Sequence, residues 1–203
     1  MSDKKIYTQE EISSLESGKE YENCVFDKHE IKGKELKECV FKQCSFENCN
    51  LINTKFNGAS FFNCNLSNTN IAGCNFFSAI LEKCKLMGLN FSKADSLIGI
   101  TFIKCNFDFA DMRGVDLSSQ DLSECSFEET DFSLANLEKT IFVNSRIINI
   151  KTNEANLLFT DFRGAELQGF DLRTTNLKGA IFTPQQLQML ATNIGIQVLD
   201  SKN

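Results

Sequence analysis

Residues 39–66 read CVFKQCSFENCNLINTKFNGASFFNCNL, and a large apolar residue occupies every fifth position of this stretch, beginning at Phe41. A small residue, Cys, Thr or Ala, stands two places before each of these large residues. The other positions are mostly Asn, Glu, Lys and Ser. Two tracks of core-type side chains therefore run along the sequence with one shared period.

The period of five extends far beyond this stretch. It runs without a miss from Phe26 to Phe91, gains one residue near 92–97, and resumes from Leu97 to Phe182. Thr152 is the single polar residue at the large position. Such self-similarity over most of a 203-residue chain indicates a repeat architecture.

A period of five fits neither an α-helix nor a long straight strand. On a helix each step of five turns by roughly 140°, so no apolar stripe forms, and on a strand it alternates between faces. Within one short extended segment, however, positions two apart share a face. The large and the small residue can then both point inward, provided that the chain turns before the next segment. Four roughly right-angle turns close a coil, and the repeats predict about eight stacked coils, roughly 38 Å tall at the usual strand spacing.

This pattern resembles that of the pentapeptide repeat family, whose consensus is A(D/N)LxX. The residues that carry the resemblance include ADM at 110–112 and ANL at 135–137 and 155–157. The resemblance implies an all-β solenoid, a right-handed quadrilateral β-helix. We expect this β-helix over 23–182, an N-terminal cap over 1–22, and a C-terminal tail over 183–203.

Both ends carry helix signals. Thr8 followed by Glu11 is a capping-box pattern, which predicts a short helix or an irregular cap over the first coil. Thr183 and Pro184 suit the start of a C-terminal helix, and Gly195 suits its end. The apolar run at 196–199 predicts a last strand.

The segment 185–199 resembles the C-terminal tail of the quinolone-resistance pentapeptide repeat proteins, the Qnr, MfpA and albicidin-resistance types. The resemblance implies a head-to-head homodimer formed through this tail. The alternative is that the tail only caps its own last coil. The expected dimer-interface residues are Leu187, Leu190, Ile196, Val198 and Leu199.

All nine cysteines lie on the small track. Disulfides need an oxidising compartment, for which the sequence carries no signal, and metal sites usually use C-x-x-C spacing, which does not occur. We therefore expect no metal, and cysteines that act as small apolar residues in the slot that Ala or Thr fills elsewhere. Six of them, about twenty residues apart, predict a ladder inside one wall: Cys24, Cys44, Cys64, Cys84, Cys105 and Cys125.

The resemblance to the quinolone-resistance members also implies a protein partner. In those proteins the dimeric rod is taken to imitate duplex DNA and to occupy the DNA site of gyrase, so we expect DNA gyrase or topoisomerase IV as the partner. The Gram-negative Qnr proteins carry two loops that bulge from the coils and are tied to rescue from quinolones. This sequence has only the insertion near 92–97 and an irregular patch near 149–154.

The charge supports such mimicry only locally. The net charge is −6 and the isoelectric point is near 5.0, which argues against a nucleic-acid-binding surface. Duplex DNA carries roughly 22 charges over the length of one such stack, far more than any wall of this rod. We expect mimicry to be confined to an acidic corner within two coils, formed by Asp108, Asp111, Glu128, Glu129 and Asp131.

An interaction module with a different protein partner is the alternative. One wall points apolar residues outward, and these can mark a partner site, reflect β-propensity, or be covered by the N-terminal segment. They are Val40, Phe62, Ile80, Ile103, Ile141 and Val143.

Catalysis is not expected. His29 is the only histidine, no nucleophile or phosphate-binding motif is present, and a filled convex rod implies no cleft for a titratable group. No cofactor is predicted. The sequence shows no secretory signal and no apolar run long enough to cross a bilayer, so we expect a cytoplasmic protein without membrane contact.

Overall fold

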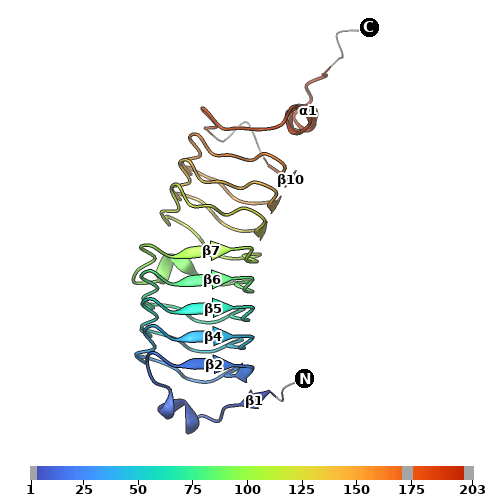
Figure 1. Ribbon diagram of the computed structural model, residues 1–203. Coiled ribbons are helices and arrows are strands. Elements are labelled where there is room, and N and C mark those ends of the chain that lie inside the picture. The colour runs from blue at the N-terminus through green and yellow to red at the C-terminus, as the bar shows by residue number, and fades with distance from the viewer. Residues whose placement is uncertain (1–3, 171–175, 199–203) are drawn as a thin grey trace.

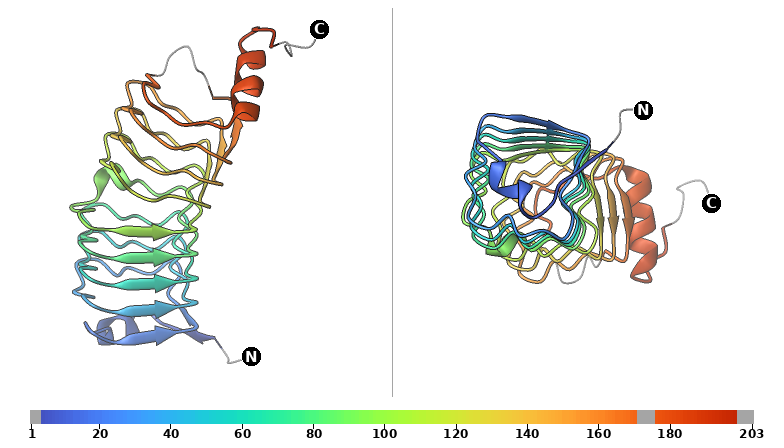
Figure 2. Two further views of the ribbon diagram at one scale, coloured as in Figure 1. Left: turned by 45° about the horizontal axis from the view of Figure 1, so that its top comes forward. Right: turned by 90° about the horizontal axis from the view of Figure 1, so that it is seen from below.

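The computed structural model describes residues 4–170 and 176–198. The chain forms a β-solenoid of about eight turns, as the repeat predicts (Figure 1). Seen along its axis, the stack has four walls (Figure 2, right). Buried apolar side chains fill the interior. We call the walls that carry Phe41, Phe46, Leu51 and Phe56 walls 1, 2, 3 and 4, and each continues in the coils above and below.

Regular strands occur on two adjacent walls, and all of their pairings are parallel. Wall 1 carries a five-stranded sheet in the lower half of the rod: β2 (Glu20–Glu22), β4 (Val40–Lys42), β5 (Ser60–Phe62), β6 (Ile80–Glu82) and β7 (Thr101–Ile103). Wall 2 carries a two-stranded and a three-stranded sheet: β1 (Lys5–Ile6) with β3 (Cys24–Val25), then β8 (Ser126–Glu128), β9 (Arg146–Ile148) and β10 (Glu166–Gln168).

The register shows where the extra residue enters. Phe41 pairs with Phe61 and Phe61 with Leu81, twenty residues apart, whereas Leu81 pairs with Phe102. A 3-10 helix, η2 (Phe91–Lys93), takes up the added residue on wall 3. The insertion is therefore absorbed in one coil, and both tracks stay inside the rod above it.

The core is a set of side-chain ladders. Rings of the same wall stack between coils, with centroids 4.9 Å apart for Phe41 and Phe61 and 5.1 Å apart for Phe107 and Phe127. These rings are fully buried. Each buried phenylalanine contributes about 1.5–3 kcal/mol of transfer free energy, so the ladders dominate the stability of the rod.

Each corner needs a residue in the left-handed region of the backbone. It stands two places after the large residue, as at Asn63 (φ 55°) and Gly73 (φ 67°). Asn and Gly adopt this conformation most readily, which explains their frequency at these positions. At Gly73 a Cβ atom would also lie 2.1 Å from the Asn53 side-chain oxygen of the coil below, so a larger residue there would require the Asn53 side chain to move.

The N-terminal segment covers the first coil. β1 pairs with β3, and a 3-10 helix, η1 (Glu11–Ser14), buries Ile12. The Thr8 and Glu11 side chains each accept a hydrogen bond from the other's backbone amide, as the capping-box pattern predicts. The strand β1 was not predicted as part of this cap. It closes the exposed lower edge of wall 2 with backbone hydrogen bonds.

His29 has a structural role at this end. Its ring nitrogen Nε2 donates a hydrogen bond to the Tyr7 carbonyl at 2.7 Å, which ties the N-terminal segment to the first full coil. This contact explains why a histidine occupies a small-residue slot of that coil.

At the other end, α1 (Pro184–Asn193) begins and ends as predicted. Thr183 and Gln186 form a capping box. The amides of Gly195 and Ile196 close the helix by donating to the carbonyls of Thr192 and Ala191. The predicted last strand is not formed by 196–198, because no described strand edge lies beside them to pair with; Leu199 lies outside the described residues.

Candidate partner-binding surfaces

The structure brings the five residues of the predicted acidic corner together. Asp111 and Asp131 face each other in a parallel bridge, and one oxygen of Asp108 accepts a hydrogen bond from the Glu128 amide at 2.8 Å. The corner joins walls 2 and 3 in two successive coils. Proximity in space was therefore predictable from the repeat.

Most of the acidic side chains of this corner form hydrogen bonds or ion pairs within the protein. Asp108 is 8% exposed, and the same oxygen also accepts from the Ser126 hydroxyl at 2.7 Å. It is a structural carboxylate, and the expectation of an exposed charge at this position was wrong. This contact was not predicted, because the sequence pattern does not show that an outward side chain just before a corner can turn and accept hydrogen bonds from the next coil.

Arginines neutralise two further acids. Arg113 binds both oxygens of Asp111, at 2.9 and 2.6 Å, and this contact lowers the pKa of Asp111. Arg146 binds Glu128 at 2.8 Å. Asp131 accepts a hydrogen bond from the Ser133 amide. Among the described residues Glu129 is the member of the corner that is exposed at a turn without an ion pair.

The apolar wall is only half open to solvent. Ile80 and Ile103 are 38% and 37% exposed, and Val40, Phe62, Ile141 and Val143 are less exposed. Four of them lie on the five-stranded sheet of wall 1. Val40 and Ile80 belong to one row of outward side chains, and Phe62 and Ile103 belong to the other. The N-terminal segment does not cover them, because it packs beneath the first coil (Figure 1).

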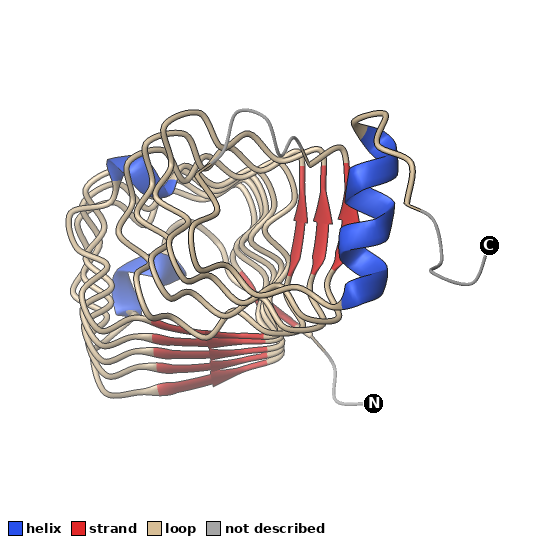
Figure 3. Cartoon of the chain, turned by 90° about the horizontal axis from the view of Figure 1, so that it is seen from above, coloured by secondary structure: helices blue, strands red, loops and turns tan. Residues whose placement is uncertain are grey.

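One part of the C-terminal tail is buried against its own chain, and another part is exposed to solvent. Leu190 is 1% exposed, and the Gln186 side-chain Nε2 donates to the carbonyls of Phe162 and Ala165, so α1 is anchored to the coil below it. Leu190 is therefore not available to a partner, which corrects its place in the expected interface. Leu187, Ile196 and Val198 are 47–53% exposed and remain candidates. α1 stands beside β10 (Figure 3). Residues of both elements line a hollow of about 480 Å³.

The cysteines are part of the core. All nine are free and buried, and the six expected in one ladder lie on wall 2, one in each coil. Seven of the thiols, those of all but Cys24 and Cys125, donate to backbone carbonyls 23 or 24 residues earlier in the chain, as from Cys49 to Phe26 at 2.8 Å. Thr130 uses its hydroxyl in the same way toward Phe107. Burial raises the pKa of Cys49 and Cys74 to about 12, which keeps these thiols protonated.

Residues 4–170 and 176–198 contain no cluster of three or more His, Cys, Asp or Glu side chains that could hold a metal ion. No helix in these ranges is long and apolar enough to cross a membrane.

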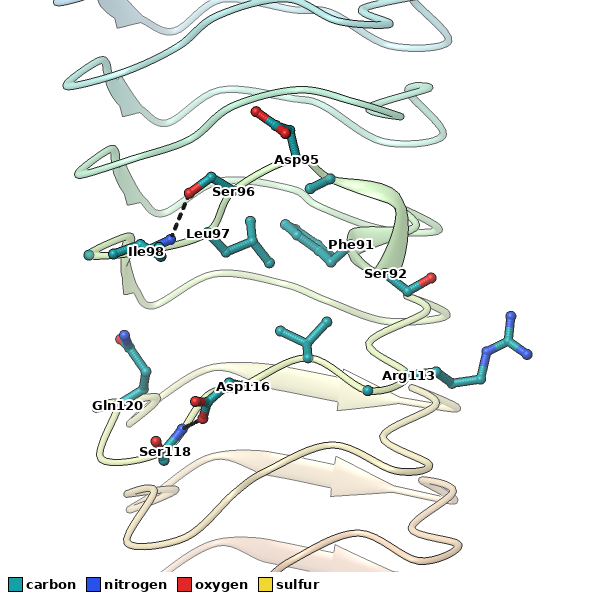
Figure 4. Close-up of a pocket in the computed structure, with 14 residues that line it drawn as sticks. Phe91, Ser92, Asp95, Ser96, Leu97, Ile98, Arg113, Asp116, Ser118 and Gln120 are labelled. Carbon is teal, nitrogen blue, oxygen red and sulfur yellow. Dashed lines mark hydrogen bonds between the residues drawn. The ribbon is translucent and has the colours of Figure 1, made fainter.

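A cleft of about 460 Å³ opens beside the insertion, where the filled rod was expected to have none. Phe91, Leu97 and Ile98 line it from the coil nearer the N-terminus, and Asp116, Ser118 and Gln120 line it from the coil nearer the C-terminus (Figure 4, in which the N-terminal coils are at the top). The extra residue was its signal in the sequence. It displaces one coil, so the next cannot pair with it on every wall.

Comparison with known proteins places the chain in a family. The model of a pentapeptide repeat region matches residues 19–91, and the model of eight pentapeptide repeats matches 110–147 and 141–179. The chain belongs to the pentapeptide repeat family. No protein with a curated description matches it in sequence.

Several solved pentapeptide repeat structures share the whole fold. A trypsin-treated variant of QnrB1, a plasmid-mediated fluoroquinolone resistance protein, superposes with a TM-score of 0.78 at 21% identity, covering 90% of this chain and 91% of that one. Full-length QnrB1 gives a TM-score of 0.62 at 19% identity and covers 95% of both chains. At this identity the likeness establishes the fold.

Some surface features of this pentapeptide repeat protein were readable from sequence. The motif D-x-R occurs at 111–113 and again at 161–163, where Arg163 binds Asp161. Outward positions two apart lie on the same face of a short strand, so such pairs neutralise each other. Counting acids alone overstated the charge of the corner.

Proposed function

We propose that this protein binds DNA gyrase or topoisomerase IV, competes there with DNA, and modulates the enzyme or protects it from quinolone-like poisons. The observation that carries the proposal is the match in fold with QnrB1 over 90% of this chain and 91% of that one. A rod whose interior is filled with apolar side chains presents its walls to a partner, which suits a non-catalytic role. Action on gyrase would place the protein in the cytoplasm.

The mode of mimicry follows from the charges that remain. Arg113 and Arg146 neutralise part of the acidic corner, so its field is far weaker than that of DNA. We infer that shape supplies most of the recognition, and that Glu129 supplies the free charge of this corner. A homodimer formed by Leu187, Ile196 and Val198 would double the length of the rod.

The test is a supercoiling assay with purified gyrase and increasing protein, with and without a fluoroquinolone. We expect inhibition at high protein alone and recovery of supercoiling in the presence of the drug. The result that would overturn the proposal is an unchanged supercoiling rate in both arms at micromolar protein.

An interaction module for another protein is the second candidate. It is favoured by the half-exposed Phe62, Ile80 and Ile103 on the flat five-stranded sheet. Two variants separate the candidates. Glu129→Lys should weaken the effect on gyrase, whereas Phe62→Ser should leave it unchanged; the reverse result would favour the apolar wall.

A further inference from the structure

The cleft at the insertion exposes strand edges that are paired elsewhere in the rod. On wall 4, the amides of Phe76 and Ser78 donate to carbonyls of the coil above at 2.8 and 2.9 Å. The equivalent amides of the next coil, Leu97 and Gly99, make no such bond within the described structure. The facing carbonyls of Asp116 and Ser118 are left without this donor.

The opening continues around the corner onto wall 1. There the amides of Phe102 and Lys104 also lack a described backbone partner in the coil above, and β7 is the last strand of its sheet. Gln120 bridges part of the gap, because its side-chain Nε2 donates to the Ile100 carbonyl at 3.2 Å. A side chain thus takes the place of the regular backbone donor.

The two coils remain joined on the opposite walls. On wall 3 the Phe91 amide donates to the Asp111 carbonyl at 2.9 Å, and on wall 2 the Phe107 amide donates to the Ser126 carbonyl at 2.8 Å. The cleft is therefore a wedge, closed at walls 2 and 3 and open at walls 4 and 1. This geometry leaves Leu97 only partly buried, although it occupies a core position.

We propose that this wedge binds an extended peptide segment, which adds as a strand to the open edge of wall 4 and places a basic side chain against Asp116. Backbone groups at an open edge pair with an extended chain, and side-chain contacts then select the sequence. The Leu97 and Gly99 amides would donate to the peptide, and the Asp116 and Ser118 carbonyls would accept from it.

The side chains at the mouth define the peptide's chemistry. Ile98 is 70% exposed and Leu97 is partly buried at the inward position, so the edge offers an apolar contact on each face of an added strand. Asp116 is exposed, and hydrogen bonds from the backbone and side chain of Ser118 lower its pKa, so it is anionic. It has no ion-pair partner in the described part of the chain. We therefore expect Lys or Arg next to an apolar residue.

The experiment is a selection from a displayed library of random seven-residue peptides on the intact protein, followed by affinity measurement of the enriched peptides. Ile98→Arg blocks the mouth of the wedge and should weaken binding at least about tenfold, the equivalent of 1.4 kcal/mol. Phe77→Arg is the matched control, because Phe77 holds the same outward position one coil below and is 47% exposed. Circular dichroism should show both variants folded.

Two further arms address the mode of binding. Methylation of alternate backbone nitrogens of the peptide removes its donors and should abolish binding, whereas a peptide held only by side chains would keep its affinity. Asp116→Asn retains the acceptor for the Ser118 amide and should weaken only peptides with Lys or Arg. Failure to enrich any peptide sensitive to Ile98→Arg, or indifference to backbone methylation, would overturn the proposal.

Discussion

At the scale of single residues, the small track combines packing with hydrogen bonding. Cys49 and Cys74 donate to carbonyls of the coil below with the geometry that Thr54 and Thr130 use. The small apolar character of cysteine explains its burial. The donor role was not considered, although the alternation of Cys with Thr in one slot was its signal.

Removal of one such donor tests this role. Thr130→Val should lower the free energy of unfolding by about 1 kcal/mol, because the Phe107 carbonyl keeps only its bond from the Ala110 amide. Thr130→Cys should cost less, since a thiol can donate in the same direction. Denaturant unfolding of the three proteins measures the difference; equal stability of the Val variant would refute the contribution of the bond.

The thiol pKa values predict a loss of stability in alkali. The pKa of Cys49 and Cys74 rises to about 12 in the folded protein, above the value of 9.0 for a free thiol. Because the folded state holds the proton more tightly, its stabilisation is full below about pH 9 and is lost as the pH rises toward 12. Chemical unfolding across this range should show the decline, and a Cys49→Thr, Cys74→Thr variant should show less of it.

At the scale of secondary-structure elements, α1 is anchored beside β10 at the C-terminal end of the rod (Figure 3). Gln186 links its first turn to the carbonyls of Phe162 and Ala165 and is 8% exposed. Gln186→Ala should lower the free energy of unfolding by about 1–3 kcal/mol, because it removes a capping box and leaves buried carbonyls with fewer donors. Gln185→Ala, on the exposed side of the same turn, is the control for helix propensity. Equal melting temperatures of the two variants would contradict this account.

The elements also show how far sequence reasoning reaches. The coil count, both caps and the position of the insertion follow from the period and from capping patterns. Pairing of 196–198 as a strand failed, because an apolar run becomes a strand only where a free edge lies beside it. The cleft was missed for the same kind of reason: the extra residue is visible in sequence, but its effect on inter-coil hydrogen bonds depends on how the coils above respond.

At the scale of the whole molecule, dimerisation would decide the length of the rod. Leu187 and Ile196 are exposed at the C-terminal end, whereas Leu190 is buried in its own chain. Analytical ultracentrifugation should give twice the 22.9 kDa chain mass. Ile196→Arg should shift the protein toward the monomer without changing its circular dichroism. If the wild-type protein is a monomer at micromolar concentration, the tail does not form a dimer interface, and α1 only caps its own chain.

The surface charge of the rod is a property that no single residue reveals. The acids of the corner cluster as the period predicts, yet Arg113 and Arg146 come from neighbouring positions and coils and neutralise them. The period located the acids correctly, but their partners were missed. The pair of Asp111 with Arg113 is visible as D-x-R in the sequence, whereas the pair of Glu128 with Arg146 joins two coils and depends on side-chain reach as well as on register. The proposed mimicry of DNA therefore depends more on the shape of the rod than on its charge.

The most direct test of this proposal is a competition experiment, in which the protein is added to purified gyrase that carries a fluorescently labelled DNA duplex. If the rod occupies the DNA site, increasing protein should lower the fluorescence anisotropy to that of free duplex, and Glu129→Lys should require more protein for the same fall. An anisotropy that stays constant while the protein is shown to bind gyrase would contradict competition with DNA, and would place the contact at another surface of the enzyme.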